Sequence, residues 1–139
     1  MTILDTNVLS ELMKPAPSSK VTQWIRSRGP ARDLCLTTIT VAEILFGIEL
    51  LPKGKRRDSL LADVEATFAA DFAGRILPFD EAAARAFPPI AAARRQRGRP
   101  ISVLDAQIAA IAKANGATLA TRNTADFEGC GVRLVNPWE

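Results

Sequence analysis

The chain has 139 residues, of which 47% are hydrophobic and 24% charged, and this composition is typical of a soluble globular protein with one domain over residues 1–139. Its net charge is +3 and it contains no His, which excludes a histidine base, a Ser–His–Asp triad and a His-rich metal site. Two cysteines are too few for a secreted disulfide framework. We see no signal peptide or membrane-spanning stretch, so we expect a reduced, cytoplasmic protein without membrane contact.

Apolar runs and helical periodicities alternate along the chain. Short strands are predicted over residues 2–4, 34–37, 75–79, 118–120 and 132–135. Helices are predicted over residues 7–13, 18–28, 40–51, 56–72, 80–96 and 102–115, and Pro88 and Pro89 must bend or break the fifth of them. Because strands and helices alternate, we expect an α/β protein, a three-layer α/β/α sandwich with a mostly parallel central sheet.

Three carboxylates stand alone in windows that should belong to the core. Each is the only charged residue of its window: Asp5 in residues 1–10, Glu43 in residues 34–48 and Asp105 in residues 100–112. Burying an unpaired carboxylate costs several kcal/mol, so such a group must be paired, protonated or bound to a metal ion. The pattern therefore indicates a site rather than three unrelated core positions.

These acids also share a position relative to the predicted sheet. Asp5 ends a strand, Glu43 and Asp105 lie in the first turn of a predicted helix, and Asp126 follows the strand over residues 118–120 by a short loop. Ligands of open α/β sheets bind beyond the carboxyl ends of the strands. Four carboxylates meeting there would repel one another unless a hard cation such as Mg²⁺ joined them, whereas zinc or copper is disfavoured without His.

Each acid taken alone also has a purely structural interpretation. The spacing of Thr40 and Glu43 matches a helix capping box, Ser102 and Asp105 resemble one, Asp5 could cap the helix that follows it, and Asp126 could be a loop acid. For a single acid, capping is the better interpretation. The joint pattern favours a site, and capping and metal binding are compatible because helix N-termini favour negative charge.

Positive charges dominate the rest of the chain. Setting the four acids aside leaves 18 positive and 11 negative side chains. Two clusters stand out, one of Lys53, Lys55, Arg56 and Arg57 and one of Arg94, Arg95, Arg97 and Arg99. They would attract a polyanion, or they are simply solvated helix ends. A metal-binding crevice in a positive field suits phosphodiester hydrolysis.

Four motifs in chain order carry a resemblance. They are ILDTNVL over residues 3–9, VAEI over residues 41–44 followed by Gly47, SVLDAQIA over residues 102–109 and TRNTADF over residues 121–127. In these motifs the chain resembles the PIN-domain family, in particular its toxin nucleases of the VapC and FitB kind.

The resemblance implies a compact α/β/α sandwich that cleaves RNA, usually as an endonuclease, with Mg²⁺ or Mn²⁺. By position, Asp5, Glu43, Asp105 and Asp126 would hold the metal ion and the attacking water, and Thr121, Asn123 and Thr6 would orient that site. Such proteins are typically homodimeric toxins of a toxin–antitoxin pair. Their antitoxin blocks the crevice, often with a basic side chain, and only the antitoxin contacts DNA.

Two other functions stay open at this point. The same metal chemistry would serve a nuclease or phosphatase that acts on DNA or another phosphate ester. A non-catalytic binding module is the second alternative, with the acids acting as caps or as a docking pocket for a basic partner peptide in a DNA-binding complex. All metal-dependent versions require Asp5, Glu43 and Asp105 to converge in space.

Overall fold

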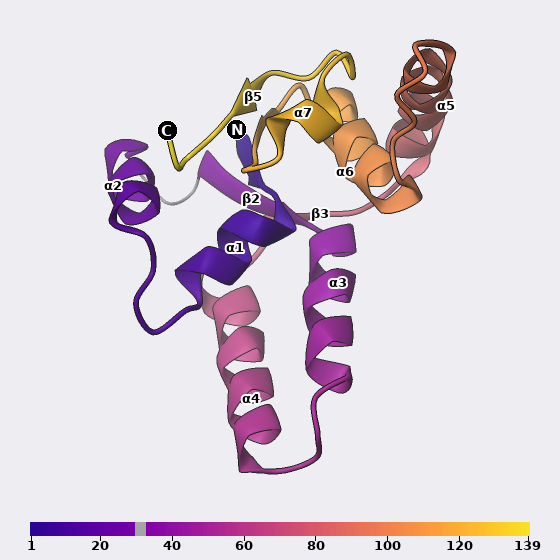
Figure 1. Ribbon diagram of the computed structural model, residues 1–139. Coiled ribbons are helices and arrows are strands. Elements are labelled where there is room, and N and C mark those ends of the chain that lie inside the picture. Colours follow the sequence, from indigo (N-terminus) through magenta and orange to yellow (C-terminus); the bar gives the residue numbers. More distant parts are fainter. Residues whose placement is uncertain (30–32) are drawn as a thin grey trace.

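The computed structural model describes residues 1–29 and 33–139, and in this part of the chain five strands form one parallel sheet in the order β3-β2-β1-β4-β5 (Figure 1). The strands are β1 (Thr2–Leu4), β2 (Leu34–Thr37), β3 (Ile76–Leu77), β4 (Thr118–Ala120) and β5 (Leu134–Val135). In the register, Ile3 pairs with Cys35 on one side and with Leu119 on the other. The most buried strand, β1, therefore lies at the centre of the sheet.

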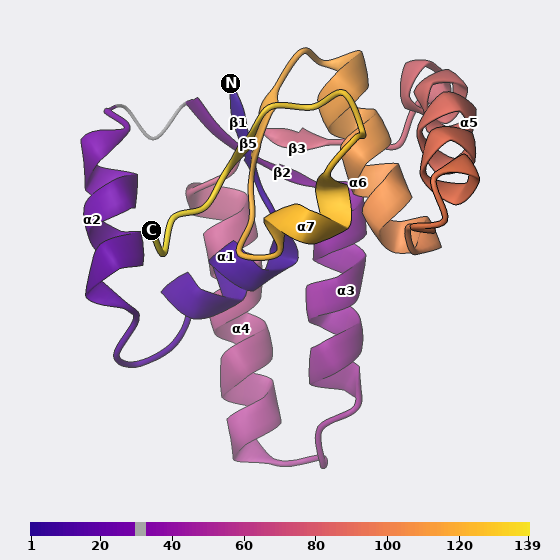
Figure 2. The same cartoon turned by 45° about the horizontal axis from the view of Figure 1, so that its top comes forward.

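Helices pack on both faces of this sheet. They are α1 (Thr6–Leu12), α2 (Ser19–Ser27), α3 (Thr38–Glu49), α4 (Lys55–Ala70), α5 (Glu81–Gln96), α6 (Val103–Ala114) and α7 (Thr124–Phe127). Figure 2 shows α5 and α6 on the opposite side of the sheet from α2. None of the helices in the described ranges is long and apolar enough to cross a membrane.

The protein has a hydrophobic cluster on each face of the sheet, because side chains alternate between the two faces along each strand. Successive side chains of a strand point to opposite faces, so Ile3 and Leu119 join a cluster with Ile108 of α6, whereas Leu4 joins a second cluster with Phe68 of α4. Both clusters consist of fully or almost fully buried apolar residues. The expected α/β/α sandwich with a parallel sheet is confirmed.

The strand order creates a switch point at the centre of the sheet. The chain places β2 and β3 on one side of β1 and then returns to place β4 and β5 on the other side. Asp5 follows β1 and Thr121 follows β4, and the Asp5 amide donates a 2.9 Å hydrogen bond to the Ala120 carbonyl. Such a switch point is where open α/β sheets bind ligands.

Several local predictions differ from the structure. The helix predicted from Thr40 begins at Thr38, because the Thr37 hydroxyl caps it by accepting a hydrogen bond from the Thr40 amide. Glu43 therefore lies beyond the first turn, and the proposed capping box of Thr40 and Glu43 is wrong. Ser102 does cap α6, by accepting from the Asp105 amide.

Two further differences concern helix continuity. The helix α5 runs through Pro88 and Pro89 to Gln96 without a break. Each proline removes only one backbone donor, while Asp80 caps the N-terminus and the buried Ile90 anchors the helix in the core. The predicted loop before Asp126 contains the short helix α7, which places Asp126 on a helix rather than in a loop.

Candidate functional site

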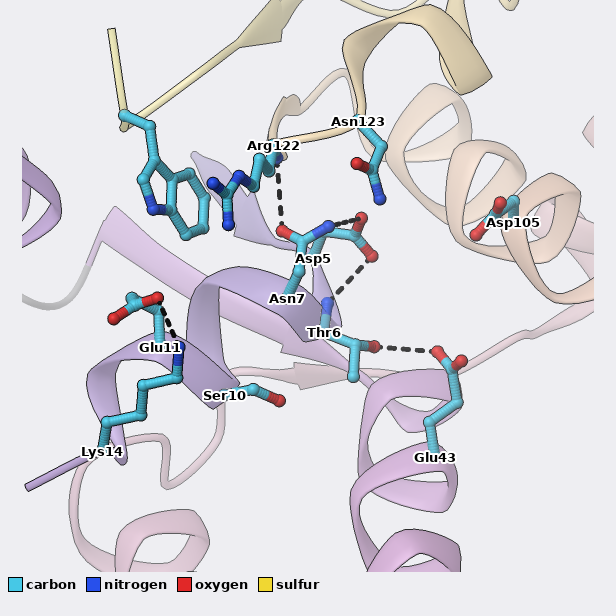
Figure 3. Close-up of a pocket in the computed structure, with 11 residues that line it drawn as sticks. Asp5, Thr6, Asn7, Ser10, Glu11, Lys14, Glu43, Asp105, Arg122 and Asn123 are labelled. Atoms are coloured by element: carbon cyan, nitrogen blue, oxygen red, sulfur yellow. Dashed lines mark hydrogen bonds and ion pairs between the residues drawn. The ribbon is translucent and has the colours of Figure 1, made fainter. Parts of the chain in front are cut away.

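A cavity of about 440 Å³ opens at the carboxyl ends of the central strands (Figure 3). Its lining residues are Asp5, Thr6, Asn7, Ser10, Glu11, Lys14, Glu43, Asp105, Arg122, Asn123 and Trp138. Three of the acids singled out in the sequence thus line this cavity. Asp5 comes from the end of β1, Glu43 from α3 and Asp105 from α6. This size is ordinary for a small-molecule or substrate site.

Asp5 is the most deeply placed acid of the cavity, with 5% of its surface exposed. Its carboxylate accepts hydrogen bonds from the Thr6 amide (2.8 Å), the Thr121 hydroxyl (2.8 Å) and the Asn7 side-chain amide (3.2 Å). Burial raises the pKa of Asp5 to about 6, the bonds from Thr121 and Thr6 oppose this rise, and the charges of Asp105 and Glu43 add to it. A cation beside Asp5 would offset both the cost of burying its charge and its repulsion from Asp105 and Glu43.

Thr121 fixes the Asp5 carboxylate from the neighbouring strand. This threonine is fully buried, and because its single hydroxyl hydrogen goes to Asp5, its oxygen is left to accept from the Asn123 amide (3.1 Å) and from Asn7 (3.3 Å). The side-chain oxygen of Asn7 in turn accepts from the Arg122 amide (3.2 Å). The loop after β4 is therefore tied to the loop after β1.

A chain of threonine hydroxyls holds Glu43. Thr6 donates to Glu43 Oε1 at 2.8 Å. Thr6 has only one hydroxyl hydrogen, so in its 3.0 Å contact with Thr40 the donor is Thr40. Thr37 contacts Thr40 at 3.5 Å as donor. Thr6 thus links the first acidic motif to the second, consistent with the orienting role that the resemblance implies for it.

Asp105 is half-buried in the first turn of α6. Burial raises the pKa of this carboxyl, the Ser102 side chain opposes the rise, and the charge of Asp126 adds to it. The N-terminus of α6 favours a negative charge at this position. A cation beside Asp105 would offset both the cost of burying its charge and its repulsion from Asp126.

Asp126 lies in an adjoining cavity rather than in the first one. This second cavity, of about 240 Å³, is lined by Arg94, Pro100, Ile101, Ser102, Asp105 and Asp126. Asp105 borders both cavities, and Asp126 itself is exposed. Asp5, Glu43 and Asp105 thus line one cavity, and Asp126 shares the adjoining cavity with Asp105.

The donor chemistry of this region suits a hard divalent cation. In the ranges 1–29 and 33–139, no three His, Cys, Asp or Glu side chains stand close enough to hold one ion as they are arranged. The donors that line the cavity are nevertheless carboxylate, hydroxyl and amide oxygens, without imidazole or thiolate. Such a set fits Mg²⁺ or Mn²⁺, and a buried carboxylate with a raised pKa fits the need for a cation.

Two arginines of the predicted basic clusters are buried or paired in the structure, which the sequence did not indicate. Arg94 belongs to a predicted surface cluster, yet only 5% of it is exposed, and its guanidinium donates to the carbonyls of Ala125 (3.3 Å) and Glu128 (2.8 Å). Its role as part of a solvated or polyanion-binding cluster is therefore wrong. In the other basic cluster, Arg57 forms a 2.8 Å ion pair with Glu49. Local charge density in a sequence gives no signal of such burial or pairing.

Comparison with known proteins identifies the family. The sequence matches the PIN domain over residues 2–129, and the chain belongs to this family. It is 42% identical to "VapC ribonuclease Y4jK" of Sinorhizobium fredii, over 100% of this chain and 99% of that protein. It is 41% identical to "Toxin FitB" of Neisseria gonorrhoeae, over 99% of both chains. The solved structure of FitAB bound to an IR36 DNA fragment superposes with a TM-score of 0.93 at 41% identity, covering 100% of this chain and 96% of that one.

Proposed function

We propose that this PIN-domain protein is a Mg²⁺- or Mn²⁺-dependent endoribonuclease and the toxin of a toxin–antitoxin pair. The observation that carries the proposal is the convergence of Asp5, Glu43 and Asp105 from three elements on one cavity, where burial raises the pKa of Asp5 to about 6. The relatives named a VapC ribonuclease and a toxin support the same activity.

Asp5, Glu43 and Asp105 would hold the metal ion, with Asp126 contributed from the adjoining cavity. When bound, the ion would neutralise the carboxylates, lower the pKa of water and stabilise charge on the phosphate. Thr121 and Thr6 orient the carboxylates of Asp5 and Glu43 through their hydroxyls. Because the chain has no His, carboxylates are the proton acceptors of the cavity near neutral pH.

The activity is tested with labelled single-stranded RNA and DNA of the same sequence, each incubated with Mg²⁺, Mn²⁺ or EDTA. We expect RNA cleavage that EDTA abolishes. Asp5→Asn and Asp105→Asn should reduce cleavage by more than about 100-fold with the fold intact, because each removes a charged ligand. The matched control is Asp63→Asn, which alters an exposed acid on α4.

The outcomes separate the alternatives. Equal activity of Asp5→Asn and the wild type would contradict the nuclease proposal. Faster cleavage of DNA than of RNA would favour a DNA-directed enzyme with the same site. No cleavage with any divalent metal, together with tight binding of a partner protein, would favour the non-catalytic binding module.

An antitoxin is the proposed protein partner. The carboxylates of the cavity would attract a basic side chain of that partner, which would block the site. The solved structure of FitAB on a DNA fragment supports a partner of this kind, and in our proposal DNA is contacted only through the antitoxin. Co-expression with a candidate antitoxin should yield a stable complex without RNA cleavage.

A second copy of the chain is the other proposed partner. Phe46 of α3 and Leu50, which follows the last residue of this helix as its C-cap, are 64% and 69% exposed and lie one helical turn apart, so they form one apolar strip. A homodimer that covers this strip would be weakened by Phe46→Glu, as measured by light scattering after gel filtration. Leu61→Glu, at a 39% exposed apolar position on α4, is the control.

A further inference from the structure

A cationic wall faces the carboxylates across the cavity. In Figure 3 the labelled Arg122 and Lys14 lie to one side of Asp5, and Glu43 and Asp105 lie to the other. Lys14 is neutralised by a 3.0 Å ion pair with Glu11. Within residues 1–29 and 33–139, Arg122 forms no ion pair within 4.0 Å. The hydrogen bond from Lys14 is the main cause that lowers the pKa of Glu11, and the charge of Arg122 adds to it, so Lys14, Glu11 and Arg122 together leave one net positive charge on this wall.

Trp138 holds the Arg122 guanidinium in place. The guanidinium carbon lies 5.0 Å from the centre of the Trp138 ring, which is within the range of a cation–π interaction. Trp138 is half-buried and packs against the core cluster that contains Leu4, so its ring is itself fixed. A guanidinium stacked on an indole keeps its N–H donors at the edge, free for a phosphate, and loses little rotamer freedom on binding one.

The backbone on both sides of this pair is also tied down. The Arg122 amide donates to Asn7 at 3.2 Å, and the Arg122 carbonyl accepts from Asn136 at 3.4 Å. Asn136 also accepts from the Trp138 amide at 2.9 Å. Because these bonds do not involve the Arg122 side chain, its replacement leaves the loop connected to Asp5.

We propose that Arg122, stacked on Trp138, binds a backbone phosphate of single-stranded RNA next to the phosphate that is cleaved. The inference rests on the proposed nuclease function. A strand that crosses the cavity places one phosphate at the carboxylate side, where a metal ion would hold it. The next phosphate then needs a cation on the opposite wall, and a fork of N–H donors suits a phosphate better than a lysine does.

The test measures binding without cleavage. A fluorescent single-stranded RNA of twelve nucleotides is titrated with protein in EDTA at several salt concentrations, and the slope of log K against log salt is determined. Arg122→Met should remove one phosphate contact on a single strand. The negative slope should therefore become shallower by about 0.7, and binding at low salt should weaken several-fold. The matched control is Arg26→Met, which removes an exposed arginine of α2 that lines none of the described cavities.

Conservative variants separate positioning from charge. Arg122→Lys should keep the slope of the wild type, because the charge remains, but bind RNA more weakly, because the stacked fork is lost. Trp138→Phe, which keeps an aromatic face, should bind better than Trp138→Leu. In the presence of Mg²⁺, Arg122→Met should raise KM and leave kcat within about threefold of the wild type, because the contact holds substrate rather than the reacting atoms.

Three results would overturn the inference. The first is a wild-type slope in Arg122→Met, and the second is the absence of salt-dependent RNA binding by the wild-type protein. The third is displacement of the RNA by poly-glutamate as effectively as by unlabelled RNA, which would reassign the pair to an acidic peptide. Cleavage by the wild-type protein in Mg²⁺ is scored separately, so an unchanged slope in an active enzyme refutes the subsite alone, and absent cleavage refutes the nuclease.

Discussion

The Thr121 hydroxyl donates a 2.8 Å hydrogen bond to Asp5, although the two residues are 116 positions apart in the chain. The register of the sheet explains this contact. Leu4 of β1 pairs with Ala120 of β4, so the residues that follow each strand emerge side by side at the carboxyl edge. The hydrogen bond is thus a consequence of parallel pairing, and it places a neutral donor on a buried carboxylate.

Removing that donor should weaken both the fold and the site. Thr121→Val keeps the shape but takes a hydrogen bond from a charged group, so we expect a loss of about 2 kcal/mol in the free energy of unfolding. Loss of an orienting partner should also lower RNA cleavage by about 10–100-fold. Urea unfolding and cleavage rates measure these effects. Thr121→Ser, which retains the hydroxyl, should stay near the wild type, and equal losses in both variants would contradict the role of this bond.

The raised pKa of Asp5 predicts a pH-dependent stability. The pKa of Asp5 is 3.8 in a model peptide and about 6 in the folded protein, so the folded state binds this proton more tightly. The stabilisation from protonated Asp5 is present below pH 3.8 and is lost as the pH rises through 6. In EDTA, the stability of the wild type relative to Asp5→Asn should therefore fall by about 2 kcal/mol between pH 4.5 and pH 8.

Urea unfolding at several pH values checks this prediction. Asp63→Asn alters an exposed acid, so the difference in stability between the wild type and this variant should not fall in this way between pH 4.5 and pH 8. A constant difference between the wild type and Asp5→Asn would show that burial does not destabilise the ionised carboxylate. Added Mg²⁺ at pH 8 should raise the Tm of the wild type more than that of Asp5→Asn, because the substitution replaces one of the charged ligands with a neutral amide.

The threonine chain that ends on Glu43 predicts graded effects. Thr6→Val removes the hydroxyl that donates to Glu43, so cleavage should fall by about 10–100-fold. Thr40→Val removes the donor to Thr6 and the acceptor of the long 3.5 Å bond from Thr37, but it leaves the bond from Thr6 to Glu43 in place and should cost less activity. Cleavage rates at saturating Mg²⁺ and the Mg²⁺ concentration for half-maximal rate are the measurements. A larger loss in Thr40→Val than in Thr6→Val would contradict this order.

The sequence predicts much of this fold because its strands are short apolar runs with clear ends. Residues 2–4, 34–37 and 118–120 are strands as expected. The predicted start of α3 at Thr40 is wrong, since Thr37, Thr38 and Thr40 can each cap a helix and in the structure Thr37 does so. The four residues of α7 are too few to show a helical period.

The site was predictable to the extent that its acids stand out locally. Asp5, Glu43 and Asp105 are lone charges in apolar windows, and they line one cavity. Asp126 has no apolar window, and no local pattern predicts that it shares a second cavity with Asp105. The pairing of Arg122 with Trp138 was missed because it joins two separate segments.

Arg94 provides the last prediction, because it holds both ends of the segment that carries Asp126. Its guanidinium donates to the carbonyls of Ala125 and Glu128, which lie on either side of Asp126. Arg94→Met removes the donor to the Glu128 carbonyl and leaves the Ala125 carbonyl with only the longer 3.5 Å bond from Arg99, but it also removes a buried Nε that lacks a partner among the described residues. We expect a net loss of about 2 kcal/mol in the free energy of unfolding.

This loss should be accompanied by local loosening of α7. Hydrogen exchange of the amides of residues 124–130 should accelerate more in Arg94→Met than exchange elsewhere in the molecule, and RNA cleavage should fall because Asp126 is no longer held. Arg94→Lys keeps one donor and should be intermediate. Arg85→Met, which breaks an exposed ion pair with Glu81 on the same helix, should cost less than about 1 kcal/mol. If Arg94→Met is destabilised but residues 124–130 exchange at wild-type rates, Arg94 supports the core and does not position Asp126.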